Sequence, residues 1–228
     1  MVSRLSPKEL FWVRSLVPPH MSNEELIEQL IKDGYLKTQL IIDAFKTIDR
    51  ARFVPEDQKQ FAYANYPLPI GFGQTISQPL TVALMLELLQ PQPGEKILDI
   101  GSGSGWQTAL LAYCVGAEGK VIGIERIPEL KKFAEENIAS CETIPQGVIK
   151  LLEEDGSKGF EEEAPFDKIV AAAAATSIPA AWKEQLKVGG KIVAPINESI
   201  YVLERKSQDE FEEKRHFGFS FVPLIGGK

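Results

Sequence analysis

Histidine and cysteine are scarce in this sequence, and their scarcity excludes several kinds of site. The chain has two histidines, His20 and His216, and two cysteines, Cys114 and Cys141. A histidine-based metal site or a Ser/His/Asp triad would have to be built from very little, so we expect neither, and we expect no metal. The cysteines have no partner motif, which argues against a disulfide framework. A reducing cytoplasm is the location that we predict.

Long apolar runs and an excess of positive charge are also missing. No run approaches the roughly 20 apolar residues of a membrane span, and residues 1–20 lack the continuous apolar core of a signal peptide. The 25 basic residues are outnumbered by 32 acidic ones, giving a net charge of −7. This balance argues against a nonspecific grip on nucleic acid or anionic lipid. We therefore expect a monomeric globular protein with neither nucleic acid nor membrane as a partner.

Helical patterns are present in the N-terminal part of the chain. Ser22, with Glu25 three residues later, forms a capping-box pattern. Apolar residues then recur at helical spacing until Gly34, which is typical of a helix end. Thr38 is placed to cap a second helix. These patterns predict two helices before the first irregular stretch.

The irregular stretch is "PLPIGFGQTISQP", residues 67–79. Its prolines and glycines predict a loop without helical structure. It carries an amide and two hydroxyls, and nothing that could act as a strong base. Pro79 is suited to the first turn of a further helix, which the apolar pattern extends to Leu89.

From Lys96 onward, short apolar runs alternate with helical patterns, which is typical of a parallel sheet covered on both faces. Two final runs have only a short charged turn between them, so the sheet should end in an antiparallel hairpin. We predict one α/β structural domain, in which residues 1–90 form a helical lobe with the irregular loop and residues 91–228 form the core. The predicted strands are 96–100, 120–125, 147–152, 166–172, 191–196, 199–206 and 215–224, with helices at 106–115, 128–140 and 180–186.

A glycine-rich turn separates the first predicted strand of the core from its helix. Gly101, Gly103 and Gly105 stand in "LDIGSGSGWQTALLA". Glycine lets the backbone approach a ligand closely and leaves amides at a helix N-terminus available for binding. A dinucleotide site would favour the spacing GxGxxG, but Trp106 occupies the last glycine position. The pattern therefore favours a ligand other than a dinucleotide.

Acidic residues mark the carboxyl ends of three successive predicted strands, where sheets of this kind bind ligands. Asp99 would repel a pyrophosphate but suits a cation, and S-adenosylmethionine carries both a sulfonium and an ammonium. Glu125 can accept the two hydroxyls of a ribose, and Asp155 is placed to meet the adenine. Simpler interpretations remain open: Asp99 as a turn cap, Glu125 as a solvated strand end, and Asp155 with Gly156 as an ordinary turn.

These motifs together resemble protein-L-isoaspartate O-methyltransferases. The likeness rests on "PLPIGFGQTISQP", "LDIGSGSGWQTALLA", "VIGIE", "EDG" and "FVPL", and it runs from about Leu26 to Leu224. It implies a Rossmann-like, class I methyltransferase fold with a mostly parallel seven-stranded sheet. The chain departs from the family pattern at "INESIYVLERK" and at 139–147, and residues 1–21 have no clear counterpart. The departures concern substrate contacts near the C-terminus and leave the cofactor positions intact.

The resemblance also implies a reaction and a set of site residues. The α-carboxylate of an L-isoaspartyl residue in a damaged protein would be methylated by S-adenosylmethionine, which starts its repair. Ser77 falls on the substrate-side serine, which we assign as catalytic, and Thr75 and Ser77 would contact the substrate. The implied cofactor positions are Gly71, Gly73, Gln74, Thr75, Asp99, Gly101, Gly103, Gly105, Glu125, Arg126, Asp155 and Gly156.

A neutral loop suits this chemistry. A carboxylate with a pKa near 4 is already ionised at neutral pH, and a sulfonium is already activated, so no strong base is needed. The enzyme must exclude water and align the reacting groups. Ser77 can orient a carboxylate, although a serine just before a proline-initiated helix is also a common N-cap.

Other functions are compatible with parts of this pattern. A methyltransferase acting on another carboxylate or a small molecule would use the same cofactor residues. A catalytically silent S-adenosylmethionine-binding protein would use only the fold, which the intact Thr75–Ser77 segment argues against. A nucleic-acid methyltransferase is disfavoured by the acidic balance and by "AAAAATSIP" after the fourth strand.

Overall fold

The computed structural model describes residues 21–226 of the chain. Residues 1–20, which include His20 and the stretch that we expect not to be a signal peptide, and residues 227–228 lie outside the described part. Between Met21 and Gly226, no helix combines the length and the apolar character needed to cross a bilayer.

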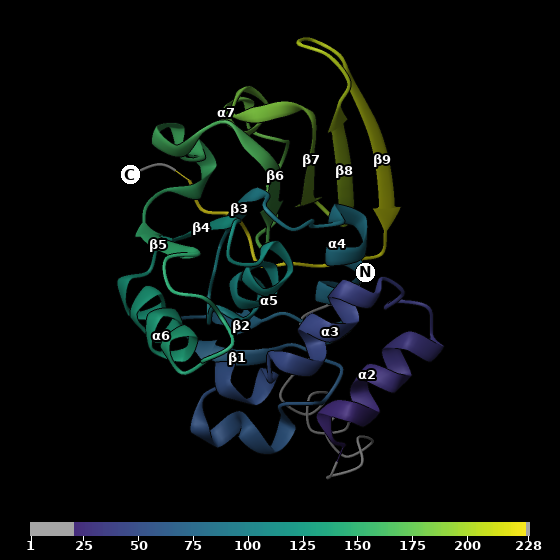
Figure 1. The fold of residues 1–228 in the computed structure, drawn as a ribbon, viewed down its shortest axis with the longest axis vertical. Helices are drawn as coiled ribbons and strands as arrows, with labels where there is room; N and C mark the ends of the chain where they lie inside the picture. The colour runs from purple at the N-terminus through teal and green to yellow at the C-terminus, as the bar shows by residue number, and fades with distance from the viewer. Residues whose placement is uncertain (1–20, 227–228) are drawn as a thin grey trace.

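A seven-stranded sheet forms the centre of the molecule (Figure 1). The first five strands of this sheet along the chain are mutually parallel, and its last two strands are antiparallel to their neighbours. This confirms the predicted mostly parallel sheet with a C-terminal antiparallel hairpin. In the spatial order of the sheet, the strands are β5 (Ile149–Glu153), β4 (Lys120–Glu125), β3 (Lys96–Ile100), β6 (Phe166–Ala171), β7 (Leu186–Ile196), β8 (Ser199–Arg205) and β9 (Phe211–Phe217).

Alternate residues of the central strands enter two separate cores. Ile97 and Val121 face the larger core, which also receives side chains from the helices at 79–89, 106–115 and 128–139 and from the N-terminal helices. Leu98 and Ile122 face the smaller core on the opposite side, where Trp182 is fully buried. Burial on both faces explains why these strands are nearly continuous apolar runs. Among residues 21–226, the α-helices are α2 (Asn23–Lys32), α3 (Gln39–Thr47), α4 (Pro79–Leu89), α5 (Trp106–Val115), α6 (Pro128–Ala139) and α7 (Ala180–Glu184). The short 3-10 helices in this part are η1 (Arg50–Phe53), η2 (Glu56–Phe61), η3 (Gly156–Lys158) and η4 (Glu161–Glu163).

The two predicted N-terminal helices are present as α2 and α3. Ser22 and Glu25 form the expected reciprocal capping box at the start of α2. Thr38 occupies the cap position of α3, but its side chain makes no capping bond. Its hydroxyl instead donates to Glu87 at 2.7 Å, which joins the start of α3 to α4. The predicted cap is therefore right in position and wrong in its bonding.

Residues 67–78 contain no helix, as predicted, and Pro79 begins α4, but the expectation of an irregular loop is wrong. Strands β1 (Leu68–Gly71) and β2 (Gln74–Ile76) pair in an antiparallel β1–β2 hairpin. Its two-residue tip is Phe72 and Gly73, with φ of 52° and 72°, as in the mirror-image turns that suit tight hairpins. Prolines and glycines concealed a buried-exposed alternation along β1 that only the paired structure reveals.

The last strand also differs from its predicted position, 215–224. Strand β9 (Phe211–Phe217) begins inside the segment that was read as a charged turn. The segment was read in this way because the exposed side chains of the strand are charged. Residues after Phe217 leave the sheet edge and run back along the carboxyl ends of the strands. There, Pro223 forms an isolated bridge with Ala174, beyond the end of β6.

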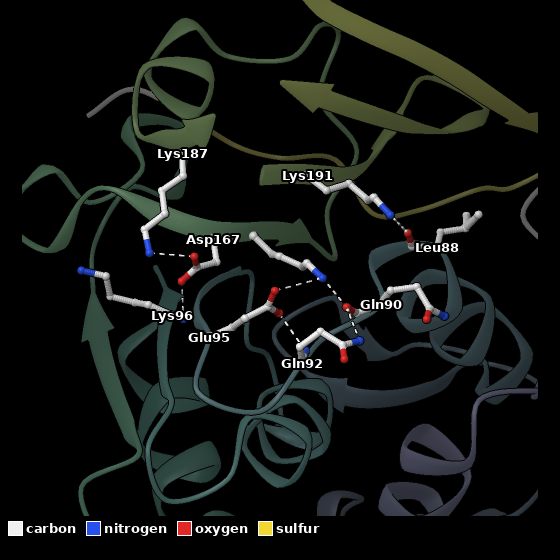
Figure 2. A network of polar contacts seen from close by, with 9 residues as sticks. Leu88, Gln90, Gln92, Glu95, Lys96, Asp167, Lys187 and Lys191 are labelled. Atoms are coloured by element: carbon white, nitrogen blue, oxygen red, sulfur yellow. Dashed lines mark hydrogen bonds and ion pairs between the residues drawn. The ribbon is translucent and has the colours of Figure 1, made fainter. Parts of the chain in front are cut away.

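Two lysines on the sheet, one on β6 and one on β7, bind the C-terminal end of helix α4 (Figure 2). Lys191 donates to the carbonyl of Leu88 at 3.0 Å, and Lys168 donates to the carbonyl of Gln90 and pairs with Glu95 at 3.2 Å. Carbonyls at a helix C-terminus have no partner within the helix and attract cations. These contacts, which we call the α4 seam, lie at the amino ends of the strands.

Candidate functional site

The candidate site lies at the carboxyl ends of β3, β4, β5 and β6. The chain passes from β3 to β4 and β5 on one side and returns as β6 on the other side, so the sheet changes direction between β3 and β6. Sheets of this type bind ligands at such a switch point. A Cβ placed on Gly101 would lie 3.9 Å from the Cβ atoms of Ala172 and Ala173, so the glycine loop and the segment after β6 are neighbours.

The three glycines of the loop have different structural roles. Gly101, Gly103 and Gly105 all have positive φ, of 82°, 54° and 89°, which other residues adopt only with strain. A Cβ on Gly105 would lie 3.1 Å from that of Ala134, so this glycine permits α5 and α6 to pack closely. A Cβ on Gly103 would lie 3.4 Å from Cδ1 of Ile70, which places the β1–β2 hairpin against the glycine loop.

Glu125 is held rigidly at the end of β4. Its side chain is only 6% exposed. One oxygen accepts the Gly103 N–H at 2.9 Å, and the other accepts the Ile127 N–H at 3.0 Å. Each carboxylate oxygen can accept a further hydrogen bond. The group is therefore a fixed pair of acceptors beside the glycine loop, which is not the solvated strand end of the simpler interpretation.

Asp99 lies beneath the glycine loop and is completely buried. Its two oxygens accept hydrogen bonds from Gln107 at 2.8 Å and Thr108 at 2.6 Å, both in the first turn of α5. Burial raises the pKa of Asp99 to about 6, against the opposing effect of these two bonds, and the charge of Glu125 raises it further. Asp99 therefore places negative charge under the loop while bracing α5.

Asp155 and Gly156 form a tight turn after β5. The Asp155 carboxylate accepts the N–H and the hydroxyl of Ser157, at 3.0 Å and 2.7 Å, and so caps η3. A Cβ on Gly156 would lie 2.5 Å from Cγ2 of Ile100, so glycine is required here by packing against β3. A Cβ on Gly226 would lie 2.9 Å from the Ser157 hydroxyl, which places the C-terminal segment against this turn.

Sequence reasoning missed the contribution of the C-terminal segment to this edge of the sheet. Leu224 N–H donates to the Ala174 carbonyl at 2.7 Å, and Ala174 N–H donates to the Val222 carbonyl at 2.8 Å. Arg126, expected to contact the cofactor, donates to the carbonyl of Ile225 at 2.9 Å. The only signal in the sequence was "FVPL", which the apolar pattern assigned to a strand. The segment instead runs across the ends of β6 and β4.

The β1–β2 hairpin carries the predicted substrate side of the site. Ser77 is half-buried directly after β2, and its carbonyl accepts a hydrogen bond from Arg50 at 3.1 Å. Helix α4 has Gln78 as its N-cap and no side-chain capping bond, so Ser77 does not cap it. Of the other predicted residues on the hairpin, Gln74 is half-buried, and Gly71, Gly73 and Thr75 are exposed.

The donor and acceptor groups at this edge fit S-adenosylmethionine. The Glu125 carboxylate can accept ribose hydroxyls, and the buried charge of Asp99 suits a cation better than a phosphate. Arg126 is exposed at this edge, and its Nη1 donates to the Ile225 carbonyl. The chemistry of the residues present therefore agrees with a cationic nucleoside ligand.

Comparisons with known proteins agree with this geometry. The model of the family described as protein-L-isoaspartate(D-aspartate) O-methyltransferase matches residues 21–228. A protein-L-isoaspartate O-methyltransferase of Methanopyrus kandleri is 44% identical over 209 residues, covering 90% of this chain and 92% of the relative. One from Aeropyrum pernix is 42% identical over 218 residues, covering 94% and 83%. A Plasmodium falciparum structure described as this enzyme, in complex with S-adenosyl-L-homocysteine, gives a TM-score of 0.81 at 28% identity and covers 90% of this chain and 99% of its own.

The sheet topology, the glycine loop and this structural neighbour define a class I S-adenosylmethionine-dependent methyltransferase. Within that class, the chain belongs to the protein-L-isoaspartate(D-aspartate) O-methyltransferase family.

Proposed function

We propose that this chain methylates the α-carboxylate of L-isoaspartyl residues in damaged proteins and so begins their repair. The observation that carries the proposal is that the hairpin lies against the glycine loop, since a Cβ placed on Gly103 would be 3.4 Å from Cδ1 of Ile70. This packing brings the segment that ends in Ser77 to the loop that resembles a cofactor site. Membership of the family supports the same reaction.

Three groups would hold the cofactor in this proposal. Glu125 would accept the ribose hydroxyls, the turn at Asp155 and Gly156 would contact the adenine, and the Asp99 charge would favour the positive sulfur. When bound, S-adenosylmethionine supplies a methyl group that its positive sulfur has already activated.

Ser77 is the residue that we assign to the substrate. Its hydroxyl has no hydrogen-bond partner that the structure records within residues 21–226, while its backbone is anchored to Arg50. A hydroxyl donor can orient a carboxylate, and it brings no second positive charge near a cationic cofactor. Because an isoaspartyl carboxylate is ionised at neutral pH, the chain needs no general base to generate the nucleophile.

A peptide panel tests the proposed function. Three peptides of one sequence would contain L-isoaspartate, L-aspartate or D-aspartate, and methyl transfer from radiolabelled S-adenosylmethionine would be measured. We expect transfer to the isoaspartyl peptide to be at least about 100-fold faster than to the L-aspartyl peptide, as when a site loses a productive alignment. Equal rates would indicate another acceptor, and cofactor binding without transfer to any peptide would indicate a silent binding protein.

A further inference from the structure

Arg50 is a fully buried arginine outside the residues assigned to cofactor or substrate. Its side chain is 0% exposed, and no carboxylate pairs with it in the described part of the chain. Burial lowers the pKa of the guanidinium to about 9, so the group remains charged at neutral pH. Its Nε has no hydrogen-bond partner within residues 21–226. A buried charge with these costs needs a reason in its contacts.

The contacts of Arg50 gather at the neck of the β1–β2 hairpin. Nη1 donates to the carbonyl of Ala62. Nη2 donates to the carbonyl of Tyr66 at 3.3 Å and to that of Ser77 at 3.1 Å. Tyr66 lies two residues before β1, and Ser77 directly follows β2. One nitrogen therefore joins the two chain segments that enter and leave the hairpin.

The guanidinium of Arg50 also contacts the residue that follows the glycine loop. Its central carbon lies 5.3 Å from the ring centre of Trp106, within the range of a cation–π contact. Trp106 is the first residue of α5 and follows the glycine loop directly. Its ring is fixed in turn by Phe45, at 5.4 Å in an edge-on arrangement, and by the carbonyl of Ile48.

We propose that Arg50 is a positioning residue for methyl transfer. Its hydrogen bonds to the carbonyls of Tyr66 and Ser77, which we call the Arg50 clasp, hold together the two segments that flank the hairpin and fix the position of Ser77 relative to the glycine loop. The proposal rests on the function proposed above, because it assigns Ser77 to the substrate. Arginine suits the task because its planar fork donates several hydrogen bonds in fixed directions while a ring stacks on its face. Lysine has one nitrogen and cannot hold three carbonyls in the same geometry. The clasp binds only the Ser77 backbone and leaves its hydroxyl to the substrate.

The test compares two substitutions of Arg50 with a matched control. Arg50→Lys keeps the charge, and Arg50→Met keeps much of the stem but removes every donor. The control is Arg205→Lys, because Arg205 is also buried and donates to backbone carbonyls, including Leu186 at 2.6 Å and Gln208 at 2.8 Å. Arg205 ends β8, at the edge of the sheet opposite the candidate site.

The melting temperature of each protein is determined first, and three further quantities are measured well below it. They are kcat for an isoaspartyl peptide, hydrogen exchange in residues 66–78, and the Kd of S-adenosylhomocysteine. We expect Arg50→Lys to lower kcat about 10- to 100-fold, as small misplacements do, and to speed exchange in the hairpin. Arg50→Met should show larger effects, and the Kd should stay within about threefold. Arg205→Lys should lower the melting temperature without changing kcat or hairpin exchange.

Unchanged kcat and hairpin exchange in folded Arg50 variants would overturn the proposal. So would an equal loss of kcat in Arg205→Lys, since that would be a general effect of lost stability. If Arg50→Met does not fold, Arg50→Lys decides alone, because it keeps charge and stem. If the wild-type chain does not methylate isoaspartyl peptides, the proposed function fails, whereas hairpin exchange still tests the clasp.

Discussion

The backbone and the side chain of Ser77 have different roles. Its carbonyl is bound by Arg50, while its hydroxyl takes no part in capping α4. Ser77→Ala should therefore lower methyl transfer to an isoaspartyl peptide about 10- to 1000-fold, with little change in melting temperature. Steady-state turnover and thermal unfolding on one preparation check this. The exposed Ser207→Ala is the control, and a destabilised Ser77→Ala of full activity would contradict the assignment.

Glu125 provides a second test at the scale of one side chain. Both of its oxygens already accept backbone N–H groups, so its orientation is fixed before any ligand arrives. Glu125→Ala should weaken S-adenosylmethionine binding by about 1–3 kcal/mol, the cost of unpaired hydroxyl donors. Calorimetry measures this directly. Glu129→Gln, an exposed change nearby in α6, should leave the affinity unaltered, and unchanged binding by folded Glu125→Ala would remove Glu125 from the site.

Asp99 makes stability and cofactor binding depend on pH in opposite directions. Because its pKa is raised to about 6, the folded chain holds a proton that the unfolded chain has lost between about pH 4 and pH 6. The stabilisation is thus complete below about pH 4 and is lost as the pH rises through 6. Asp99→Asn stays neutral, so its stability relative to the wild-type chain should increase by about 2–3 kcal/mol from pH 4 to pH 7.

Binding of the cationic cofactor should show the reverse trend. The ionised Asp99 attracts a cation, so wild-type affinity for S-adenosylmethionine should fall as the pH drops below about 6, and Asp99→Asn should bind weakly at every pH. Denaturant unfolding and calorimetry across the pH range measure both effects. A constant stability difference between the two proteins would show that Asp99 does not titrate in this window.

At the scale of elements, the backbone at the tip of the β1–β2 hairpin is strained. Phe72 has φ of 52° and a side chain that is 59% exposed, although a bulky residue seldom adopts this conformation. Phe72→Asn should raise the free energy of unfolding by up to about 1 kcal/mol, since asparagine tolerates left-handed turns. Denaturant titration measures it. A lower stability would mean that the ring supports the hairpin by contacts that outweigh the strain.

Elements with local signals could be predicted from the sequence, and elements that depend on distant partners could not. Strands β3 and β4 and helix α5 have the predicted bounds, because short apolar runs and the glycine loop mark where these elements begin and end. Strand β9 was misplaced because an edge strand with charged side chains resembles a turn. The β1–β2 hairpin was read as a loop because its pairing is visible only in three dimensions.

The candidate site shows the same division. Its acidic residues were found because each lies within two residues of the carboxyl end of a strand, where the topology brings strand ends together. Arg50 could not be found, because "DRARFVP" contains two arginines and the pattern does not show which one is buried. Only the structure shows three carbonyls around one of them.

Across the whole molecule, the candidate site and the α4 seam lie at opposite ends of the parallel strands. The candidate site lies at the carboxyl ends, and the α4 seam lies at the amino ends. In the seam, burial and the nearby charge of Lys168 lower the pKa of Lys191. Lys168 is nearly buried, and it satisfies the Gln90 carbonyl while pairing with Glu95. Removing one partner of such a cluster leaves the other groups desolvated and unpaired.

Lys168→Met should therefore lower the free energy of unfolding by about 2–4 kcal/mol while leaving turnover per folded molecule within about twofold, because additivity holds for distant sites. Lys206→Ala is the control: Lys206 pairs with Glu204 and Glu212 on the exposed surface, where ion pairs stabilise little. Denaturant unfolding and isoaspartyl-peptide turnover at 25 °C, where both variants stay folded, measure the two effects. If Lys168→Met instead lost turnover without losing stability, the seam would be coupled to the site through α4, whose first turn follows Ser77, and the two ends of the strands would not be independent.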